Sequence, residues 1–290
     1  MAGAFSPNPI ADVQQLLSYH FMLNALRAGT IVAVLAGVIG YFMVLRRQSF
    51  AGHSLAVVGF PGAAGATLLG VSPVLGYFGF CAAGALLIAA LPGGGRAIGN
   101  RGEESAVIGT LQAFALACGF LFVSLYQGFL TSLNDLLFGT ITGVSDEQVL
   151  VLLLAGLACL AVLLVIGRPL LFASVDPAVA RGRGVPVRLL SAAFLLLLGL
   201  AVAGTSQITG SLLVFALLVA PAATAARLTA RPGLGIVLSV VIAVAVSWLG
   251  EAIAFYSPYP IGFWVTSLAF AGYLLATGYR LTRDRAGDRA

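Results

Sequence analysis

Two ionisable side chains, His53 and Glu251, interrupt otherwise apolar stretches and are the strongest candidates for chemistry. A neutral imidazole can bind zinc or manganese transiently, with its softness favouring zinc. Glu251 could supply a carboxylate to the same transient site. The alternative for His53 is a hydrogen bond to a backbone or hydroxyl group. Glu251 could instead hydrogen-bond a neighbouring helix or extend outward to the aqueous surface. The residues alone leave both interpretations open.

Other polar candidates lie outside the apolar runs. His20 precedes the first long apolar run, and Asp135 lies in a more polar stretch. Both could steer a cation or meet a partner protein, and both could equally be solvated loop residues. The three cysteines stand alone in apolar runs without a paired spacing, which favours packing over a structural metal site or a disulfide.

The composition indicates that most of the chain lies in a lipid membrane rather than in water. Hydrophobic residues make up 60% of the 290 residues and charged residues 9%, whereas a soluble domain carries about 25% charged residues. The sequence therefore predicts a polytopic, all-α transmembrane bundle forming a single domain over residues 1–290. At about 20 residues each, about nine spans are expected, near residues 22–45, 50–71, 73–91, 105–126, 148–167, 189–206, 211–229, 234–256 and 260–280.

The arginines predict the orientation. With the N-terminus outside, 14 of the 15 basic residues fall on the cytoplasmic side and only Arg27 lies outside, as the positive-inside rule requires. The C-terminus is then cytoplasmic. The expected location of the protein is the inner membrane of a bacterial cell. This placement explains the net charge of +5 without a nucleic-acid partner. Two predicted loops are longer than the others: residues 127–147 on the outer side and residues 168–188 on the inner side.

The inner loop contains signals for a short helix. Asp176 followed by Pro177 is a typical helix start, because the carboxylate caps free N–H groups and proline suits the first helical position. Either Gly182 or Gly184, followed by Pro186, is a typical stop. The helix is either a plain connector on the membrane surface or a coupling helix that seats in a partner protein.

Prolines within predicted spans mark bends in the helices. Pro61, followed by Gly62, and Pro221 each free a backbone carbonyl and kink a helix. Small residues beside them allow close helix contact or leave space for an ion path.

Three stretches, residues 21–50, 176–187 and 210–227, resemble the permease subunits of bacterial ABC importers for divalent metals, the zinc/manganese/chelated-iron family. The resemblance covers nearly the whole chain. It implies a homodimer, or a pair of similar permeases, on two cytosolic ATPase subunits, with an extracytoplasmic metal-binding protein delivering the ion. It also implies that the inner-loop helix contacts the ATPase through Asp176, Pro177, Ala180, Arg181 and Gly184.

The resemblance implies a transport subunit without catalysis of its own. ATP and magnesium would bind to the partner ATPase, and this chain would bind only the transported ion, moving it by alternating access. The sequence agrees, because it has no lysine and thus no Walker motif. The family usually has an acidic residue at the position of His53 and a histidine at that of Val57. These departures leave zinc, manganese and iron open, with zinc slightly ahead.

Two other classes of protein compete with this interpretation. A gradient-driven secondary transporter or channel acting without an ATPase would need ionisable residues in several spans, and this chain offers His53 and Glu251. An intramembrane enzyme would need a cluster of catalytic side chains at one depth, which the predicted topology does not provide.

Overall fold

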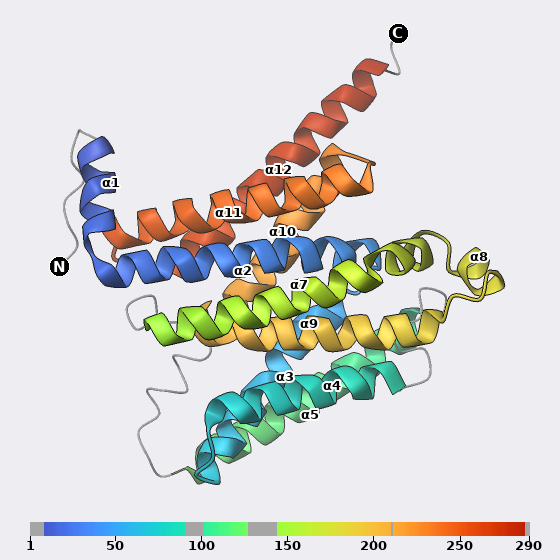
Figure 1. Ribbon diagram of the computed structural model, residues 1–290, viewed down its shortest axis with the longest axis horizontal. Helices are drawn as coiled ribbons and strands as arrows, with labels where there is room; N and C mark the ends of the chain where they lie inside the picture. Colours follow the sequence, from blue (N-terminus) through green and yellow to red (C-terminus); the bar gives the residue numbers. More distant parts are fainter. Residues whose placement is uncertain (1–8, 91–100, 127–143, 210, 288–290) are drawn as a thin grey trace. The chain divides into compact units, whose positions relative to one another are not determined.

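The computed structural model describes residues 9–90, 101–126, 144–209 and 211–287, and every regular element in these ranges is an α-helix (Figure 1). The predicted all-α class is therefore confirmed. The helices are α1 (Pro9–Ser18), α2 (His20–Leu45), α3 (Ser49–Leu68), α4 (Pro73–Ala90), α5 (Arg101–Leu125), α7 (Asp146–Val175), α8 (Pro177–Gly182), α9 (Val187–Thr209), α10 (Ser211–Leu228), α11 (Pro232–Tyr256) and α12 (Ile261–Gly287).

Each of the nine apolar segments predicted as spans coincides with one of these helices. Seven described helices are long and apolar enough to cross a membrane, whereas α3 and the described part of α10 fall outside that set. The reason in α3 is its composition, since serine, threonine, histidine and several glycines dilute its apolar residues. The count of nine spans and the orientation thus stay predictions.

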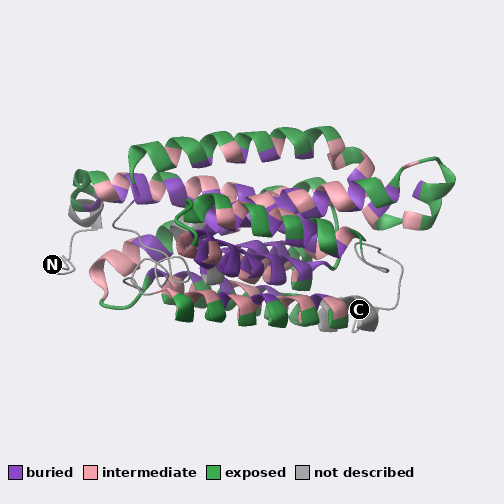
Figure 2. Ribbon diagram, turned by 90° about the horizontal axis from the view of Figure 1, so that it is seen from below, coloured by how far each residue is buried: buried purple, intermediate pink, exposed green. Residues whose placement is uncertain are grey.

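The chain divides into two compact units, each assembled from separate segments. One unit comprises residues 1–44, 140–153 and 216–290, and the other comprises residues 45–139 and 154–215. A single domain over residues 1–290 stays a prediction. Several long helices carry exposed residues along one side and buried residues along the other (Figure 2). This pattern suits helices that pack on one side and face lipid on the other.

In the first unit, α2 and α11 run antiparallel in close contact through glycine. Gly37 of α2 lies against Val240 of α11, where a Cβ atom would be 2.7 Å from the Val240 Cα atom. The Ser239 hydroxyl donates a hydrogen bond of 2.8 Å to the Gly37 carbonyl oxygen. Further along the pair, Gly235 of α11 packs against the ring of Tyr41. Small residues thus let the two backbones approach, as is common between membrane helices.

Replacing Gly40 with Ala is expected to destabilise the first unit. A Cβ atom at Gly40 would overlap the backbone carbonyl oxygen of Leu218 in α10, and a backbone atom cannot rotate away as a side chain can. Overpacking of this kind costs about 1–3 kcal/mol. The melting temperature of the purified chain in detergent should fall in Gly40→Ala and hold in Gly272→Ala, because no atom lies within 4 Å of a Cβ at Gly272. Equal melting temperatures would contradict the close contact.

In the second unit, α3 packs against α4, α5 and α9. The Tyr77 hydroxyl of α4 donates a hydrogen bond of 2.8 Å to the Ala56 carbonyl oxygen of α3. The Ser54 hydroxyl donates one of 2.7 Å to the Gln112 side chain of α5. These bonds satisfy buried polar groups that would be costly in an apolar setting.

Much of the predicted inner loop, residues 168–188, is helical. Helix α7 does not end at residue 167 but continues through Pro169 to Val175. Leu170 and Ala173 are both fully buried, so packing of this last part of α7 offsets the backbone hydrogen bond that Pro169 removes. The non-helical connection therefore shrinks to short stretches on either side of α8.

Candidate functional site

Helix α8 begins as the sequence predicts. Asp176 has an extended backbone, and its Oδ1 atom accepts hydrogen bonds from the backbone N–H groups of Ala178 and Val179, at 3.1 and 3.0 Å. Pro177 occupies the first helical position. The carboxylate therefore satisfies two donors that have no partner within the helix itself.

The end of α8 is also defined locally. Gly184 has a φ of +78°, and the Val185 N–H group donates a hydrogen bond of 3.0 Å to the Ala180 carbonyl oxygen. This is the pattern of a Schellman cap, which favours glycine at the left-handed position. Ala180 is buried, whereas Arg181 is exposed. The helix is thus anchored on one side and presents a basic surface on the other.

Arg46 joins the two helices that flank α8. It lies in the turn after α2, is 6% exposed, and donates hydrogen bonds from Nη1 to the Ser174 hydroxyl at 3.2 Å and from Nη2 to the Ser191 hydroxyl at 2.5 Å. Its Nε atom donates to the Gln48 side chain at 3.0 Å, and its guanidinium lies 5.4 Å from the ring centroid of Phe194. We call these contacts the Arg46 network.

The Arg46 network connects the two helices on either side of α8. Ser174 lies two residues before Asp176 at the end of α7, and Ser191 lies in the second turn of α9. A single guanidinium therefore bridges the helix that enters α8 and the helix that leaves it. In the sequence, Arg46 serves only to predict the orientation of the chain. No local pattern indicates that it bonds to Ser174 and Ser191, which are 128 and 145 residues away.

Glu251 is buried in the first unit and faces α2. It is 2% exposed, and a Cβ atom at Gly29 would overlap its Oε1 atom. Oε1 accepts a hydrogen bond of 3.1 Å from the Ser247 hydroxyl, whereas Oε2 has no hydrogen-bond partner among the described residues. Burial in α11 therefore replaces the alternative in which the carboxylate reaches toward the aqueous surface.

His53 lies in the first turns of α3, in the second unit, and is partly buried. Its ring centroid is 4.7 Å from that of Phe215, and its Nδ1 atom is buried without a hydrogen-bond partner in the described part of the chain. His53 and Glu251 belong to different units. In the described ranges, three or more His, Cys, Asp or Glu side chains nowhere form a group able to hold a metal ion.

The prolines lie at helix contacts. Beside Pro61, a Cβ atom at Gly62 would overlap the carbonyl oxygen of Gly76 in α4, so the small size of Gly62 serves close packing. Pro221 lies inside α10, three residues after Leu218, whose carbonyl oxygen lies against Gly40. A role of these positions in an ion path stays a prediction.

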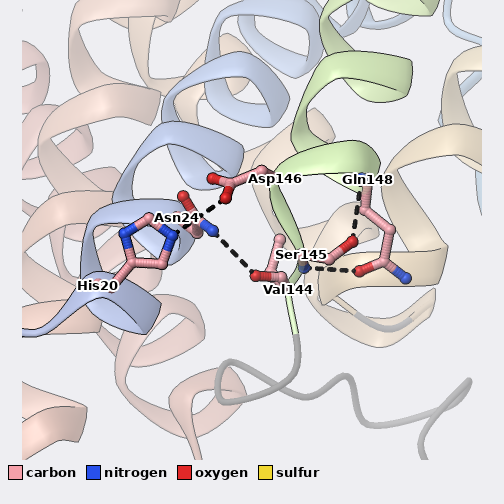
Figure 3. Close-up of polar contacts among 6 residues, drawn as sticks. All are labelled: His20, Asn24, Val144, Ser145, Asp146 and Gln148. Carbon is pink, nitrogen blue, oxygen red and sulfur yellow. Dashed lines mark hydrogen bonds and ion pairs between the residues drawn. The ribbon is translucent and has the colours of Figure 1, made fainter.

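His20 meets the start of α7. Its Nε2 atom lies 3.1 Å from Oδ2 of Asp146, and the Nδ2 group of Asn24, one turn further along α2, donates a hydrogen bond of 3.2 Å to the Val144 carbonyl oxygen (Figure 3). We call His20, Asn24 and Asp146 the His20 cluster. Asp135, the other predicted outer-face candidate, lies outside the described residues.

The start of α7 is held by a reciprocal cap. The Ser145 hydroxyl accepts a hydrogen bond of 3.2 Å from the Gln148 N–H group, and the Gln148 side chain accepts one of 3.0 Å from the Ser145 N–H group (Figure 3). This capping box fixes the first turn that carries Asp146. The sequence contains the signal, a serine followed three residues later by glutamine, but nothing in it pairs Asp146 with His20.

Comparisons with known proteins agree on the family. The sequence profile of the ABC 3 transport family matches residues 18–280. The chain is similar to the manganese transport system membrane protein MntC of Halalkalibacterium halodurans, with 35% identity over 217 residues, covering 75% of this chain and 73% of that protein. It is also similar to the chelated iron transport system membrane protein YfeC of Yersinia pestis, with 32% identity over 246 residues, covering 83% and 80% of the two chains.

A solved structure shares the fold. PsaBC from Streptococcus pneumoniae in complex with Fab superimposes with a TM-score of 0.80 at 27% sequence identity, over 92% of this chain and 94% of that chain. The resemblance noted from the three sequence stretches is therefore confirmed. With its seven membrane-length apolar helices, this polytopic membrane protein belongs to the ABC 3 transport family.

Proposed function

We propose that the chain is the transmembrane subunit of an ATP-driven importer for a divalent transition metal ion. The observation that carries this proposal is the exposed, doubly capped helix α8, whose flanking helices are tied together by Arg46. A cytosolic ATPase that grips α8 can move α7 and α9 together. The assembly contains two such ATPase subunits, which bind ATP and magnesium, and a second copy of the permease.

Delivery by a binding protein sets the direction of transport as import. With α8 in the cytosol, an extracytoplasmic binding protein delivers the ion to the opposite side of the bacterial inner membrane. ATP-driven movement of α8 then alternates access to a path between the spans. This chain hydrolyses nothing itself.

Manganese is the first candidate for the ion, because several relatives carry manganese in their names, MntC of Halalkalibacterium halodurans among them. Zinc is the second, because the imidazole of His53 is a ligand that suits zinc. A host that lacks its own manganese and zinc importers, and expresses the chain with its ATPase and binding protein, tests this. Growth restored by manganese alone, by zinc alone or by both assigns the ion. Growth restored by neither excludes these two ions and leaves iron as the candidate for the same test.

We further propose that Glu251 and His53 line the path. A buried carboxylate within a membrane helix is costly and commonly serves transport, and one oxygen of Glu251 has no hydrogen-bond partner among the described residues. The Nδ1 atom of His53 is in the same situation. Both groups can therefore offer a lone pair to a passing cation.

Replacing Glu251 with Gln should lower ⁵⁴Mn uptake by at least about tenfold, because removal of a group that supports a metal site costs about 10–100-fold. The fold should persist, since an amide oxygen can still accept the Ser247 hydrogen bond. His53→Ala should also lower uptake. Uptake is measured in cells with equal amounts of each variant in the membrane, with Glu147→Gln as the control carboxylate. Normal uptake in Glu251→Gln would remove Glu251 from the path.

A further inference from the structure

We propose that the His20 cluster is a binding site for a divalent transition metal ion. His20 supplies an imidazole nitrogen, Asp146 a carboxylate oxygen and Asn24 an amide oxygen. The assignment of this site to the extracytoplasmic mouth rests on the proposed function and orientation. It is made of residues other than the proposed path residues His53 and Glu251.

The geometry of the His20 cluster suits a cation. His20 and Asn24 are four residues apart in α2 and therefore share one helix face, and Figure 3 shows both side chains beside Asp146. The Nε2 and Oδ2 atoms are 3.1 Å apart. Two ligands at right angles, each about 2.1 Å from an ion, are separated by about 3 Å, so an ion fits between them with little movement.

Asn24 supplies an independent observation. It is 2% exposed, and its Oδ1 atom has no hydrogen-bond partner among the described residues. Its Nδ2 group donates to the Val144 carbonyl oxygen and also interacts with the Asp146 carboxylate, so the amide oxygen is the atom of Asn24 that is left without a partner among the described residues. A buried acceptor without a donor is unfavourable, and a bound cation would remove that cost.

Two of the three ligands are open to solvent. The side chains of His20 and Asp146 are 72% and 67% exposed, so an ion can reach them without any opening of the fold. Each ligand lies on a helix, and the capping box of Ser145 and Gln148 holds the first turn of α7. Three protein ligands leave positions for water, or for a ligand from a delivering protein.

The surrounding charge makes the site a transient one. Arg27, exposed one turn beyond Asn24, acts electrostatically on Asp146 and repels a cation. One imidazole with two oxygen ligands accommodates both manganese and zinc, and such a weak site releases its ion readily. The competing interpretation is a plain hydrogen-bonded His–Asp pair with no ion.

The first test is a manganese titration of the full-length chain in lipid nanodiscs without ATP, followed by the electron paramagnetic resonance signal of free Mn²⁺. His20→Ala and Asp146→Asn should each weaken one binding site at least about tenfold. Glu147→Gln is the matched control, since it removes a carboxylate from the same helix turn, and its Kd should stay within about twofold of the wild-type value. Equal Kd values in Asp146→Asn and Glu147→Gln would overturn the site.

Asn24→Asp distinguishes an ion site from a structural contact. A carboxylate in place of the amide strengthens a metal site, so the Kd for Mn²⁺ should fall at least about threefold, and Mn²⁺ should raise the melting temperature of this variant. A purely structural Asn24 would lose its bond to Val144 and gain no affinity. Unchanged or weaker binding would therefore overturn the role of Asn24.

The outcomes also separate this inference from the proposed function. ATP-driven uptake by the wild-type chain with no effect of His20 or Asp146 on Mn²⁺ binding would sink the site alone. Mn²⁺ binding that follows these variants, in a chain that transports no metal with its ATPase, would sink the importer proposal and leave the site.

Discussion

Asp176→Ala combined with Gly184→Ala is expected to lower ATP-driven metal uptake by at least about tenfold while the chain still inserts in the membrane. Loss of the Asp176 cap costs about 1 kcal/mol, and a side chain at the left-handed position of Gly184 costs about 1–2 kcal/mol. A helix of about two turns is not stable on its own, so without its caps α8 should lose its rigid shape. The ATPase would then hydrolyse ATP without moving α7 and α9.

The matched control replaces the same two kinds of residue without disturbing the caps. Asp176→Asn removes the charge but keeps a side-chain oxygen for capping, and Gly182→Ala adds a Cβ into open space at a residue without a positive φ. This double variant should retain coupling. The readout is the number of metal ions transported per ATP hydrolysed. The same ratio in both double variants would remove the docking role of α8.

Arg46→Ala should produce the second large effect, a loss of both stability and coupling. Arg46 is buried and donates hydrogen bonds to the hydroxyl groups of Ser174 and Ser191. Its removal leaves both hydroxyl oxygens without this donor. A buried polar group left without its donor costs about 1–3 kcal/mol, and Ser191 and Gln48, which both accept from Arg46, are buried. The melting temperature in detergent should fall, and so should the metal transported per ATP.

Arg47→Ala is the control for charge and position. Arg47 lies in the same turn but is exposed, so its replacement removes the same charge from the same place in the predicted topology. Arg46→Lys should be intermediate, because a lysine keeps the charge but lacks the planar fork that reaches both helices. Indistinguishable results for Arg46→Ala and Arg47→Ala would contradict the bridging role of Arg46.

Local sequence signals predict the local features of this fold well. The start of α8 follows from Asp176 and Pro177, because caps depend on neighbours within a few residues. For its end the sequence offers Gly182 or Gly184, and the structure places the positive φ at Gly184. The nine apolar runs likewise mark nine helices. The true end of α7 escapes such signals, since burial of Leu170 and Ala173 overrides the proline at position 169.

Contacts between distant segments could not be predicted from one sequence. The pairing of His20 with Asp146 joins residues 126 positions apart, and that of Arg46 with Ser191 joins residues 145 apart. These separations are far longer than a helical repeat or a sequence motif, so neither pattern could predict the two contacts. The close approach of Gly29 to Glu251 is hidden for the same reason, since it depends on the register between α2 and α11.

The most direct test of the proposed importer is metal uptake by right-side-out vesicles that contain the chain. ⁵⁴Mn²⁺ is offered outside together with the binding protein, and the vesicles are loaded with ATP or left without it, with and without the co-expressed ATPase. Our account predicts uptake only when ATP and the ATPase are both present. Uptake by the purified chain alone, driven by an ion gradient, would contradict it.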